Sequence, residues 1–295
     1  MAEHEWVVGE FEKNRGHLRA VAYRMLGSAS EADDAVQEAW LRLNRSDAST
    51  IGNLGGWLTT VVARVCLDML RARASRKEEA LDGEPLEPFA AHPATTDPEK
   101  EALLADSVGV ALLIVLDRLE PAERLAFVLH DMFAVPFDEI ASIISRSPEA
   151  TRQLASRARR RVQGTPAIPK SSLTEQRQVN EAFLAALRSG DVAAVVAVLD
   201  PEVVVRVDAA AAAGGGPREV HGAETWARGA VAFSRNVAGD LQLMLIDGEV
   251  GVVLAATDGS LRIMRCSIAN GRIASAEIIA DQARIRDFEL AVLDA

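Results

Sequence analysis

The residues with the clearest chemistry lie in one stretch, SPEATRQLASRARRRV, residues 147–162. At about 100° per residue, a helix over this stretch places small and apolar side chains on one face and polar ones on the other. The polar face and its flanks carry Arg152, Gln153, Ser156, Arg157, Arg159 and Arg160. Arginine can contact guanine through two hydrogen bonds, glutamine can contact adenine, and further arginines can bind phosphates. These residue types therefore predict a helix that lies in the major groove of DNA.

The residues around the start of this helix predict how it is positioned. Residues 137–144 repeat apolar side chains at helical spacing, and residues 145–147 are typical of a turn. Ser147 can cap the next helix, and Pro148 then occupies its first position, where the missing N–H removes no hydrogen bond. The pattern predicts a helix-turn-helix. The alternative is a solvated basic helix at a domain end, but the turn, the cap and the separated faces favour DNA binding.

The composition restricts the classes of protein that could carry such a helix. The chain has 295 residues, a formal net charge of -11, 49% hydrophobic and 25% charged residues, which indicates two or three globular domains. An acidic chain is poorly suited to coating nucleic acid, so DNA contact must come from local patches. Neither a signal peptide nor a run of about 18 apolar residues occurs, so a cytoplasmic protein without membrane contact is expected.

Cysteine usage gives no support for a disulfide framework or a zinc site. Cys66 and Cys266 are the only cysteines, and neither has a His or Cys partner at metal-ligand spacing. Two buried thiols are the expectation. No metal, no cofactor and no catalytic residue is predicted for the chain.

Helical periodicity covers residues 11–75, with helices expected over 11–26, 31–43 and 57–73. Ser30 is the expected cap of the second helix. Opposite its apolar face, that helix presents an acidic row: Asp33, Asp34, Gln37 and Glu38. Such a row would bind DNA poorly but would suit a partner with basic residues. The alternative is an ordinary solvated helix face.

The last part of the chain has a different pattern. Helices are expected over residues 174–188 and 191–199. Apolar runs typical of strands follow at 203–207, 241–246, 250–256, 261–268 and 272–279. Three dipeptides between these runs are strong hairpin signals: Asp247-Gly248, Asp258-Gly259 and Asn270-Gly271. The pattern predicts an antiparallel sheet with helices against one face, an α+β domain.

The order of the helical blocks resembles the extracytoplasmic-function (ECF) group of the sigma-70 family, which has only sigma regions two and four. FEKNRGHLRAVAYRMLGSASEADDAVQEAWLRL and GGWLTTVVARVCLDMLRARASRK resemble region two, and LDRLEPAERLAFVLHDMFAVPFDEIASIISRSPEATRQLASRARRRV resembles region four. The resemblance implies two all-α domains, the second with a helix-turn-helix, followed by the α+β domain. The expected divisions are region two at 5–76, an acidic Pro-rich linker at 77–101, region four at 102–164, a second linker at 165–172 and the α+β domain at 173–295.

The same resemblance implies a partner for each surface. The acidic row would bind core RNA polymerase at the clamp helices of its largest subunit, and the basic helix would read the minus-35 element of promoter DNA. The loop before the third helix, and that helix itself, would hold the melted minus-ten strand. The expected minus-ten residues are Asn53, Gly55, Arg64, Arg71, Arg73 and Arg76. Holding an unpaired strand requires cationic contacts to its backbone and close approach of the chain.

The part from residue 173 onward resembles the SnoaL-like extension that a subset of these factors carries, an α+β roll related to ketosteroid-isomerase-like proteins. Arg206, Asp208 and His221 are the polar residues expected to line a cavity in this roll, where an unidentified small ligand could bind. Enzymes with related rolls use a carboxylate base and hydroxyl donors, but these three residues lack a spacing that defines a catalytic constellation. A regulatory or ligand-sensing role is therefore favoured over catalysis.

These patterns together predict a transcription initiation factor that directs core RNA polymerase to promoters and is modulated by its own C-terminal domain. The alternative is a one-component regulator that binds operator DNA without polymerase and senses a ligand through the roll. An enzyme with a DNA-binding appendage is a third interpretation. Copurification with core polymerase distinguishes the first two, because a one-component regulator has no need of the acidic row.

Overall fold

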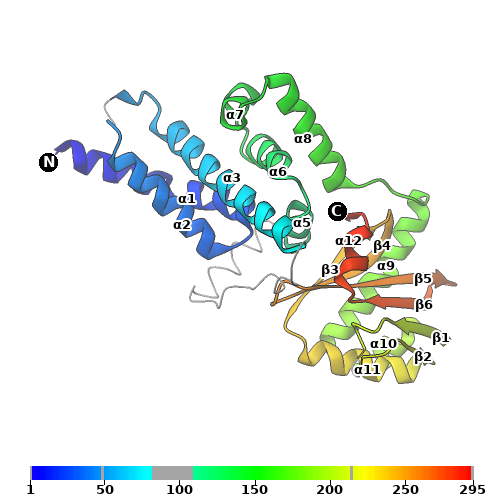
Figure 1. Cartoon of the computed structure of the whole chain (residues 1–295). Helices are drawn as coiled ribbons and strands as arrows, with labels where there is room; N and C mark the ends of the chain where they lie inside the picture. Colours follow the sequence, from blue (N-terminus) through cyan, green and yellow to red (C-terminus); the bar gives the residue numbers. More distant parts are fainter. Residues whose placement is uncertain (1, 48–49, 82–108, 213–214, 294–295) are drawn as a thin grey trace. The chain divides into compact units, whose positions relative to one another are not determined.

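The computed structural model describes most of the chain, namely residues 2–47, 50–81, 109–212 and 215–293. Among the described residues there are two compact units: a helical unit with residues 2–81 and 113–160, and an α+β unit with residues 161–293 to which residues 110–112 are also assigned (Figure 1). Helical blocks followed by an α+β domain were the predicted fold class, and the observed order of elements confirms it.

Three helices with a shared apolar core make up the first half of the helical unit: α1 (Ala2–Leu26), α2 (Ala29–Asn44) and α3 (Leu54–Leu81). Helix α1 contacts both of the others, and each helix contributes fully buried side chains such as Leu18, Leu43 and Leu58. Burying a leucine side chain contributes about 1.5–3 kcal/mol relative to leaving it exposed. Packing of the three apolar faces therefore holds this half together.

The N-cap of helix α2 lies two residues before the predicted one. Ser28, not Ser30, is the N-cap, and its Oγ accepts a hydrogen bond from the backbone N–H of Glu31 at 3.4 Å. Ser30 lies in the first turn, where its hydroxyl is 3.0 Å from that of Ser28. Both serines have the side chain of a good cap, so composition alone could not decide which residue ends the loop.

Helix α3 begins earlier and ends later than predicted. The side chain of Asn53 accepts a hydrogen bond from the backbone N–H of Gly56 at 3.0 Å, so the helix starts at Leu54, in the first turn after this cap. At its other end the helix continues to Leu81, into the predicted linker at 77–101. The rest of that linker lies outside the described residues.

The second half of the helical unit contains the predicted helix-turn-helix. Its elements are α5 (Val110–Leu116), α6 (Pro121–Phe127), the π-helix η2 (Val128–Met132), α7 (Phe137–Ile144) and α8 (Pro148–Gln163). The chain leaves α7 through Ser145, whose φ of 56° is left-handed. The Ser147 hydroxyl then accepts a hydrogen bond from the backbone N–H of Ala150 at 3.2 Å, and Pro148 is the first residue of α8. The turn and the cap are confirmed.

A buried arginine joins the two halves of the helical unit. Arg124 of α6 is 2% exposed, and its Nε donates to the backbone oxygen of Arg24, in the last turn of α1, at 3.2 Å. Its Nη1 donates to the Asp117 carboxylate, just after α5, at 3.3 Å. The last carbonyl groups of a helix lack partners within it, and the helix dipole favours a cation there. The Arg124 guanidinium therefore ties α6 to α1.

The α+β unit is built on a seven-stranded sheet with strand order β2-β1-β6-β5-β4-β3-β7. Its helices are α9 (Lys170–Ser189), α10 (Val192–Ala197), α11 (Ala223–Asn236) and α12 (Gln282–Asp287). Its strands are β1 (Leu199–Val207), β2 (Arg218–His221), β3 (Gly239–Ile246), β4 (Glu249–Ala256), β5 (Leu261–Ala269), β6 (Arg272–Ile279) and β7 (Leu290–Val292). Among these described strands, β1 runs parallel to β6 and the other pairs are antiparallel. The expected wholly antiparallel sheet is therefore corrected to a mixed one.

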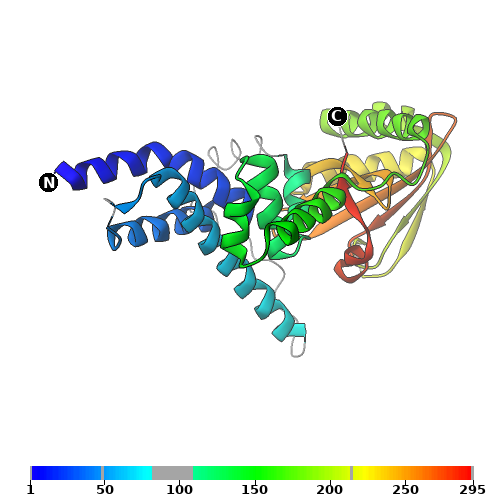
Figure 2. The ribbon, with the colours of Figure 1, turned by 90° about the horizontal axis from the view of Figure 1, so that it is seen from above.

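Helices α9, α10 and α11 cover one face of this sheet, and α12 lies on the other side of the strands (Figure 2). Phe183 of α9 and Trp226 of α11 stack with ring centroids 5.3 Å apart and are almost fully buried. They belong to one core with inward-facing side chains of the sheet, among them Val203, Val205 and Cys266. The predicted packing of helices against one sheet face is confirmed.

Two of the three hairpin dipeptides have positive φ at both residues, whereas in Asp258-Gly259, between β4 and β5, only the glycine has a positive φ, 81°. In the β3–β4 turn, Asp247 and Gly248 have φ values of 51° and 80°, and in the β5–β6 turn, Asn270 and Gly271 have values of 54° and 69°. Positive φ at both central residues defines the type I′ turn, which matches the twist of the flanking strands. These two turns fix the register of the hairpins and hence which side chains face the core.

Candidate nucleic-acid and polymerase interfaces

The polar face of α8 is turned toward solvent. Thr151, Ala155 and Ala158 on its inner face are completely buried. On the outer side Arg159 is half-buried, and the exposed residues are Arg152, Gln153, Ser156, Arg157 and Arg160. The segregation of faces inferred from helical angle is therefore confirmed. The contact of these residues with DNA stays a prediction.

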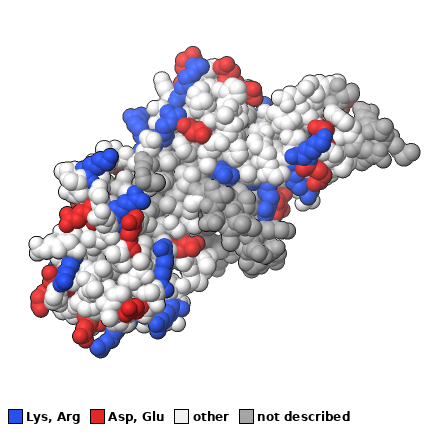
Figure 3. All heavy atoms as spheres, turned by 180° about the vertical axis from the view of Figure 1, so that it is seen from behind, with Lys and Arg blue, Asp and Glu red and all other residues white. Residues whose placement is uncertain are grey.

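Two arginines of α8 contact carboxylates on other elements of the helical unit. Nε of Arg157 donates to Oε1 of Glu123 at 3.0 Å, and Nε and Nη2 of Arg159 donate to Oδ1 of Asp131 at 2.9 and 2.6 Å. Helical periodicity missed both carboxylates, because they lie 34 and 28 residues away in the sequence. On the face drawn in Figure 3, basic and acidic side chains are interspersed.

The acidic row of α2 also includes ion pairs. Its members, exposed except for a half-buried Glu38, are Asp33, Asp34, Gln37 and Glu38. Nε of Arg19 in α1 donates to Asp33 at 2.6 Å, and Nε of Arg42 donates to Glu38 at 2.8 Å. These two carboxylates are partly neutralised within the helical unit. Reversing the charge of Asp34 therefore changes the acidic row without breaking either of these ion pairs.

The arginines predicted to contact the minus-ten strand do not share one environment. The exposed residues of the predicted set are Asn53, in the loop before α3, and three arginines of α3, namely Arg64, Arg71 and Arg76. Arg73, in contrast, is half-buried: it forms an ion pair with Glu31 and donates to the backbone oxygen of Leu26 at 3.4 Å. Arg73 thus has a structural role at the end of α1, which the helical pattern did not predict.

The turn before α3 gives Asn53 and Gly55 a structural role as well. Asn53 caps the helix, as described above. A Cβ at Gly55 would lie 3.0 Å from Oδ1 of Asn14 in α1, closer than ordinary van der Waals contact. Glycine at this position therefore leaves room for the Asn14 side chain.

The three polar residues predicted to line a cavity of the roll lie elsewhere. Arg206 is on the exposed side of β1, and its Nε donates to Glu219 at 2.9 Å. His221 is exposed on β2, with Nε2 3.4 Å from the same carboxylate. Asp208 follows β1 and accepts hydrogen bonds at 2.7, 2.9 and 3.0 Å from the backbone N–H groups of Ala211, Ala280 and Asp281. Asp208 therefore closes a loop, and the expected cavity lining is corrected.

Replacing Asp208 with Asn is expected to destabilise the α+β unit by about 1–2 kcal/mol, because one oxygen that accepts from backbone N–H groups is lost. Burial disfavours the charged form, but the three N–H donors outweigh it and lower the pKa of Asp208. The stabilisation is therefore present above the unfolded-state pKa of about 3.9 and is lost as pH falls through the folded-state pKa. Thermal unfolding of both proteins at neutral and acidic pH checks this. An equal difference at both pH values would contradict it.

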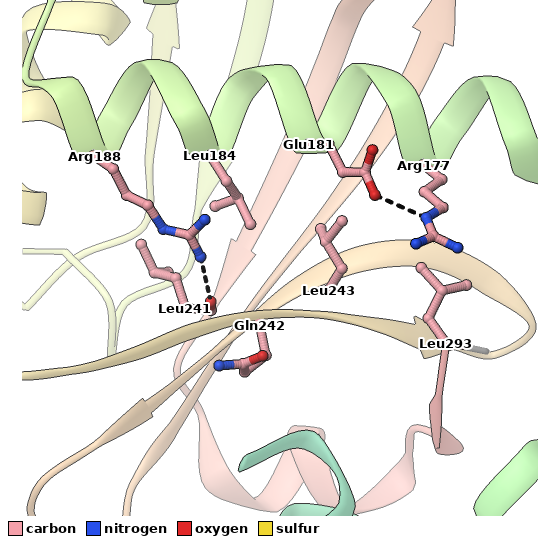
Figure 4. A pocket seen from close by; sticks show the side chains of 8 residues that line it. All are labelled: Arg177, Glu181, Leu184, Arg188, Leu241, Gln242, Leu243 and Leu293. Carbon is pink, nitrogen blue, oxygen red and sulfur yellow. Dashed lines mark hydrogen bonds and ion pairs between the residues drawn. The ribbon is translucent and has the colours of Figure 1, made fainter. Parts of the chain in front are cut away.

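A groove of about 260 Å³ lies in the α+β unit between α9 and β3 (Figure 4). Its lining consists of Arg177, Glu181, Leu184, Arg188, Leu241, Gln242, Leu243 and Leu293. Nε of Arg177 donates to Glu181 at 2.8 Å, and Nη2 of Arg188 donates to the backbone oxygen of Leu241 at 3.3 Å. Both arginines are thus engaged with the protein itself, and the geometry assigns no ligand to the groove.

Known proteins match both the helical unit and the chain as a whole. Residues 11–76 match the Sigma-70 region 2 family, and residues 110–162 match the family described as Sigma-70, region 4. The chain is 38% identical over 286 residues to the ECF RNA polymerase sigma factor SigJ of Mycobacterium tuberculosis, across 93% of this chain and 91% of that protein. The chain belongs to the sigma-70 family. It is an ECF sigma factor, as its motifs indicated, and a sigma factor directs RNA polymerase to promoters. The one-component regulator is not favoured.

Solved structures are similar to this sigma factor over different lengths. The crystal structure of Mycobacterium tuberculosis SigJ is 36% identical, covers 94% of this chain and 98% of that one, and gives a TM-score of 0.46. An NTF2-like protein from Mesorhizobium loti is 16% identical and covers 40% of this chain and 99% of that one, with a TM-score of 0.32.

The cysteines of this sigma factor are both buried and unpaired, as predicted, and burial raises the pKa of each thiol to about 12. Within the described ranges, no three His, Cys, Asp or Glu side chains are grouped so that they could hold a metal ion. No helix in those ranges is long and apolar enough to cross a membrane.

Proposed function

We propose that this sigma factor uses three surfaces to start transcription. The acidic row of α2 binds the clamp helices of core RNA polymerase, the loop before α3 and the exposed arginines of α3 hold the melted minus-ten strand, and α8 reads the minus-35 element. The observation that carries the proposal is the form of α8: a capped second helix of a helix-turn-helix with a small-residue inner face and an Arg/Gln/Ser outer face. The chain performs no catalytic step in this function, and it works in the cytoplasm with the polymerase.

The two kinds of charged surface support different partners. The acidic row would be repelled by DNA phosphates, whereas basic residues on a protein partner would match it. The outer face of α8 offers hydrogen-bond donors in the pattern that base edges require, Arg for guanine and Gln for adenine. Opposite charge on the two surfaces favours one orientation of the chain between polymerase and promoter.

Copurification of the full chain with core polymerase tests this proposal against the one-component regulator. A stoichiometric complex that forms without DNA is the expected result. A chain that binds operator-like DNA tightly but does not bind core polymerase would contradict the proposal.

The α+β unit is proposed to modulate transcription. The motivation is its covalent attachment to a complete pair of sigma regions, together with the acidic composition of residues 77–101, which could compete with nucleic acid for cations.

Deleting residues 170–295 is expected to change promoter-dependent transcription with purified core polymerase by about fivefold or more. About fivefold is the lower end of the effect that one site of a protein typically has on the affinity of another. Transcript yield from a single promoter measures the change. Thermal unfolding of the shortened chain serves as the control that its helical unit is intact. Unchanged polymerase binding and unchanged transcript yield would rule out modulation by this domain.

A further inference from the structure

We propose that Asp131 and Phe137 are positioning residues for promoter reading, because each holds one arginine of α8 in place. Asp131 holds Arg159, and Phe137 holds Arg152. This inference rests on the proposed function of α8 and adds to it the residues that orient its side chains. Neither Asp131 nor Phe137 lies on α8 itself, so neither belongs to the basic stretch from which that function was inferred.

The contact between Asp131 and Arg159 has a defined geometry. Asp131 lies in the π-helix η2, and its side chain is 19% exposed. One of its carboxylate oxygens accepts from both Nε and Nη2 of Arg159, at 2.9 and 2.6 Å. The planar guanidinium group is thereby held along one edge, while its side chain remains 43% exposed. The N–H groups of Nη1 are on the edge away from this contact, where a base could accept from them.

The contact between Phe137 and Arg152 uses the aromatic ring. Phe137 is the first residue of α7, and the guanidinium carbon of Arg152 lies 5.6 Å from its ring centroid, within the range of a cation–π interaction. The ring is itself held by His130 of η2, which stacks on it with centroids 3.7 Å apart. Nδ1 of His130 lies 3.1 Å from the backbone oxygen of Val135 in the intervening loop.

The short segment from η2 to the start of α7 therefore supports both arginines. A π-helix is rare and adds a residue to a helical turn, and such turns often occur at functional sites. The loop that follows it turns sharply at Ala134, which has a φ of 55°. Hydrogen bonds from the N–H groups of Ala134 and Val135 back to His130 and Leu129, at 3.0 and 2.9 Å, hold this turn.

Holding an arginine before DNA arrives has two physical consequences. Ordering a long side chain loses conformational entropy, and a side chain that is already ordered in the free protein loses less when it binds. A carboxylate beside Arg159 also reduces the net attraction to phosphates, which all sequences share, while leaving directional hydrogen bonds to a base. Both effects raise discrimination between bases more than they raise affinity for DNA in general.

The test uses the full chain with core polymerase and a set of promoters in which each base pair of the upstream element is changed in turn. The variants are Asp131→Asn, which keeps the shape but removes the charge, and Phe137→Leu, which keeps an apolar contact for His130 but removes the ring. Asp138→Asn, an exposed carboxylate on α7, is the matched control. Transcript yield is measured for every promoter at several salt concentrations.

We expect each of the two variants to lose about five- to tenfold in discrimination at a single base pair, since a well-placed arginine contact accounts for most of the preference there. Asp131→Asn should also strengthen binding to unmatched DNA and steepen its salt dependence. In the Arg159→Ala background, Asp131→Asn should cause no further loss of discrimination. Asp138→Asn should leave the base preferences as they are in the wild type.

Two outcomes would overturn the inference. Equal loss on all promoters together with a lower unfolding temperature would mean that Asp131 and Phe137 act only in folding. Unchanged base preferences in both variants would mean that the arginines need no support. A wild-type chain without base-dependent transcription would instead overturn the proposed function, on which the inference rests, so the two failures are distinguishable.

Discussion

Replacing Asp34 with Lys is expected to lower the affinity of this sigma factor for core RNA polymerase by roughly 30-fold, about 2 kcal/mol, because the change would place a like charge against the basic surface proposed to bind the acidic row. Asp34 is exposed on α2, between Asp33 and Glu38, which already have arginine partners in the helical unit. Reversal at this residue therefore changes the row without breaking an ion pair that the fold uses. Titration of labelled protein with core polymerase measures the affinity, and transcription from every promoter should fall in parallel.

The matched control for this prediction is Asp240→Lys. Asp240 is an exposed carboxylate of β3 in the α+β unit, so its reversal changes the net charge of the chain by the same amount. The control should retain the wild-type affinity for polymerase. If the two variants lose affinity equally, the effect comes from net charge, and the acidic row is not the docking surface.

Replacing Arg152 with Ala is expected to reduce transcription roughly fivefold to 150-fold, the equivalent of about 1–3 kcal/mol, on promoters with the preferred base at one upstream position. Promoters with a different base at that position should be much less affected, since the contact that is lost was not made there. The reason is geometric: the Arg152 side chain lies on the outer face of α8, near its start, where recognition helices contact bases.

Arg161→Ala provides the comparison for a phosphate contact. Arg161 flanks the outer face near the end of α8 and is exposed. Its loss should weaken binding to all sequences by a similar factor and reduce the salt dependence of binding. Equal effects of both substitutions on every promoter would show that the assignment of the two faces is wrong.

Local signals explain which parts of the fold were predictable from sequence. Ser147, Pro148 and the apolar spacing before them predict the helix-turn-helix because caps and turns depend on neighbouring residues. The Asp247-Gly248 and Asn270-Gly271 turns are predictable for the same reason, since few residue types adopt positive φ at both positions. Such signals specify elements and hairpins without long-range information.

Pairings between distant segments were not predictable. Strands β2 and β7 lack hairpin dipeptides at their ends, and the parallel pairing of β1 with β6 joins residues about seventy positions apart in sequence. Sequence periodicity depends on residues within a few turns of one another. It therefore predicts that β1 is a strand but not which strand pairs with it. The mixed sheet follows from this crossover, which the hairpin signals do not describe.

The candidate site shows the same limit at the level of side chains. Helical angle places Arg157 and Arg159 on the outer side of α8, and the structure agrees. Helical angle alone does not predict that Glu123 and Asp131 bind these two guanidinium groups. Nor does it predict that Arg73 faces Glu31 instead of solvent. A run of basic residues in the sequence gives the number of cations. Their function also depends on which of them form ion pairs with carboxylates in the folded protein.

The most direct test of the account is transcription in vitro with purified core polymerase and the full chain, followed by mapping of the start sites. Transcripts are expected to begin at defined positions only when the chain is present, downstream of a shared pair of upstream and minus-ten elements. Transcription that is the same with and without the chain, or a chain that only represses transcription started by another sigma factor, would contradict it.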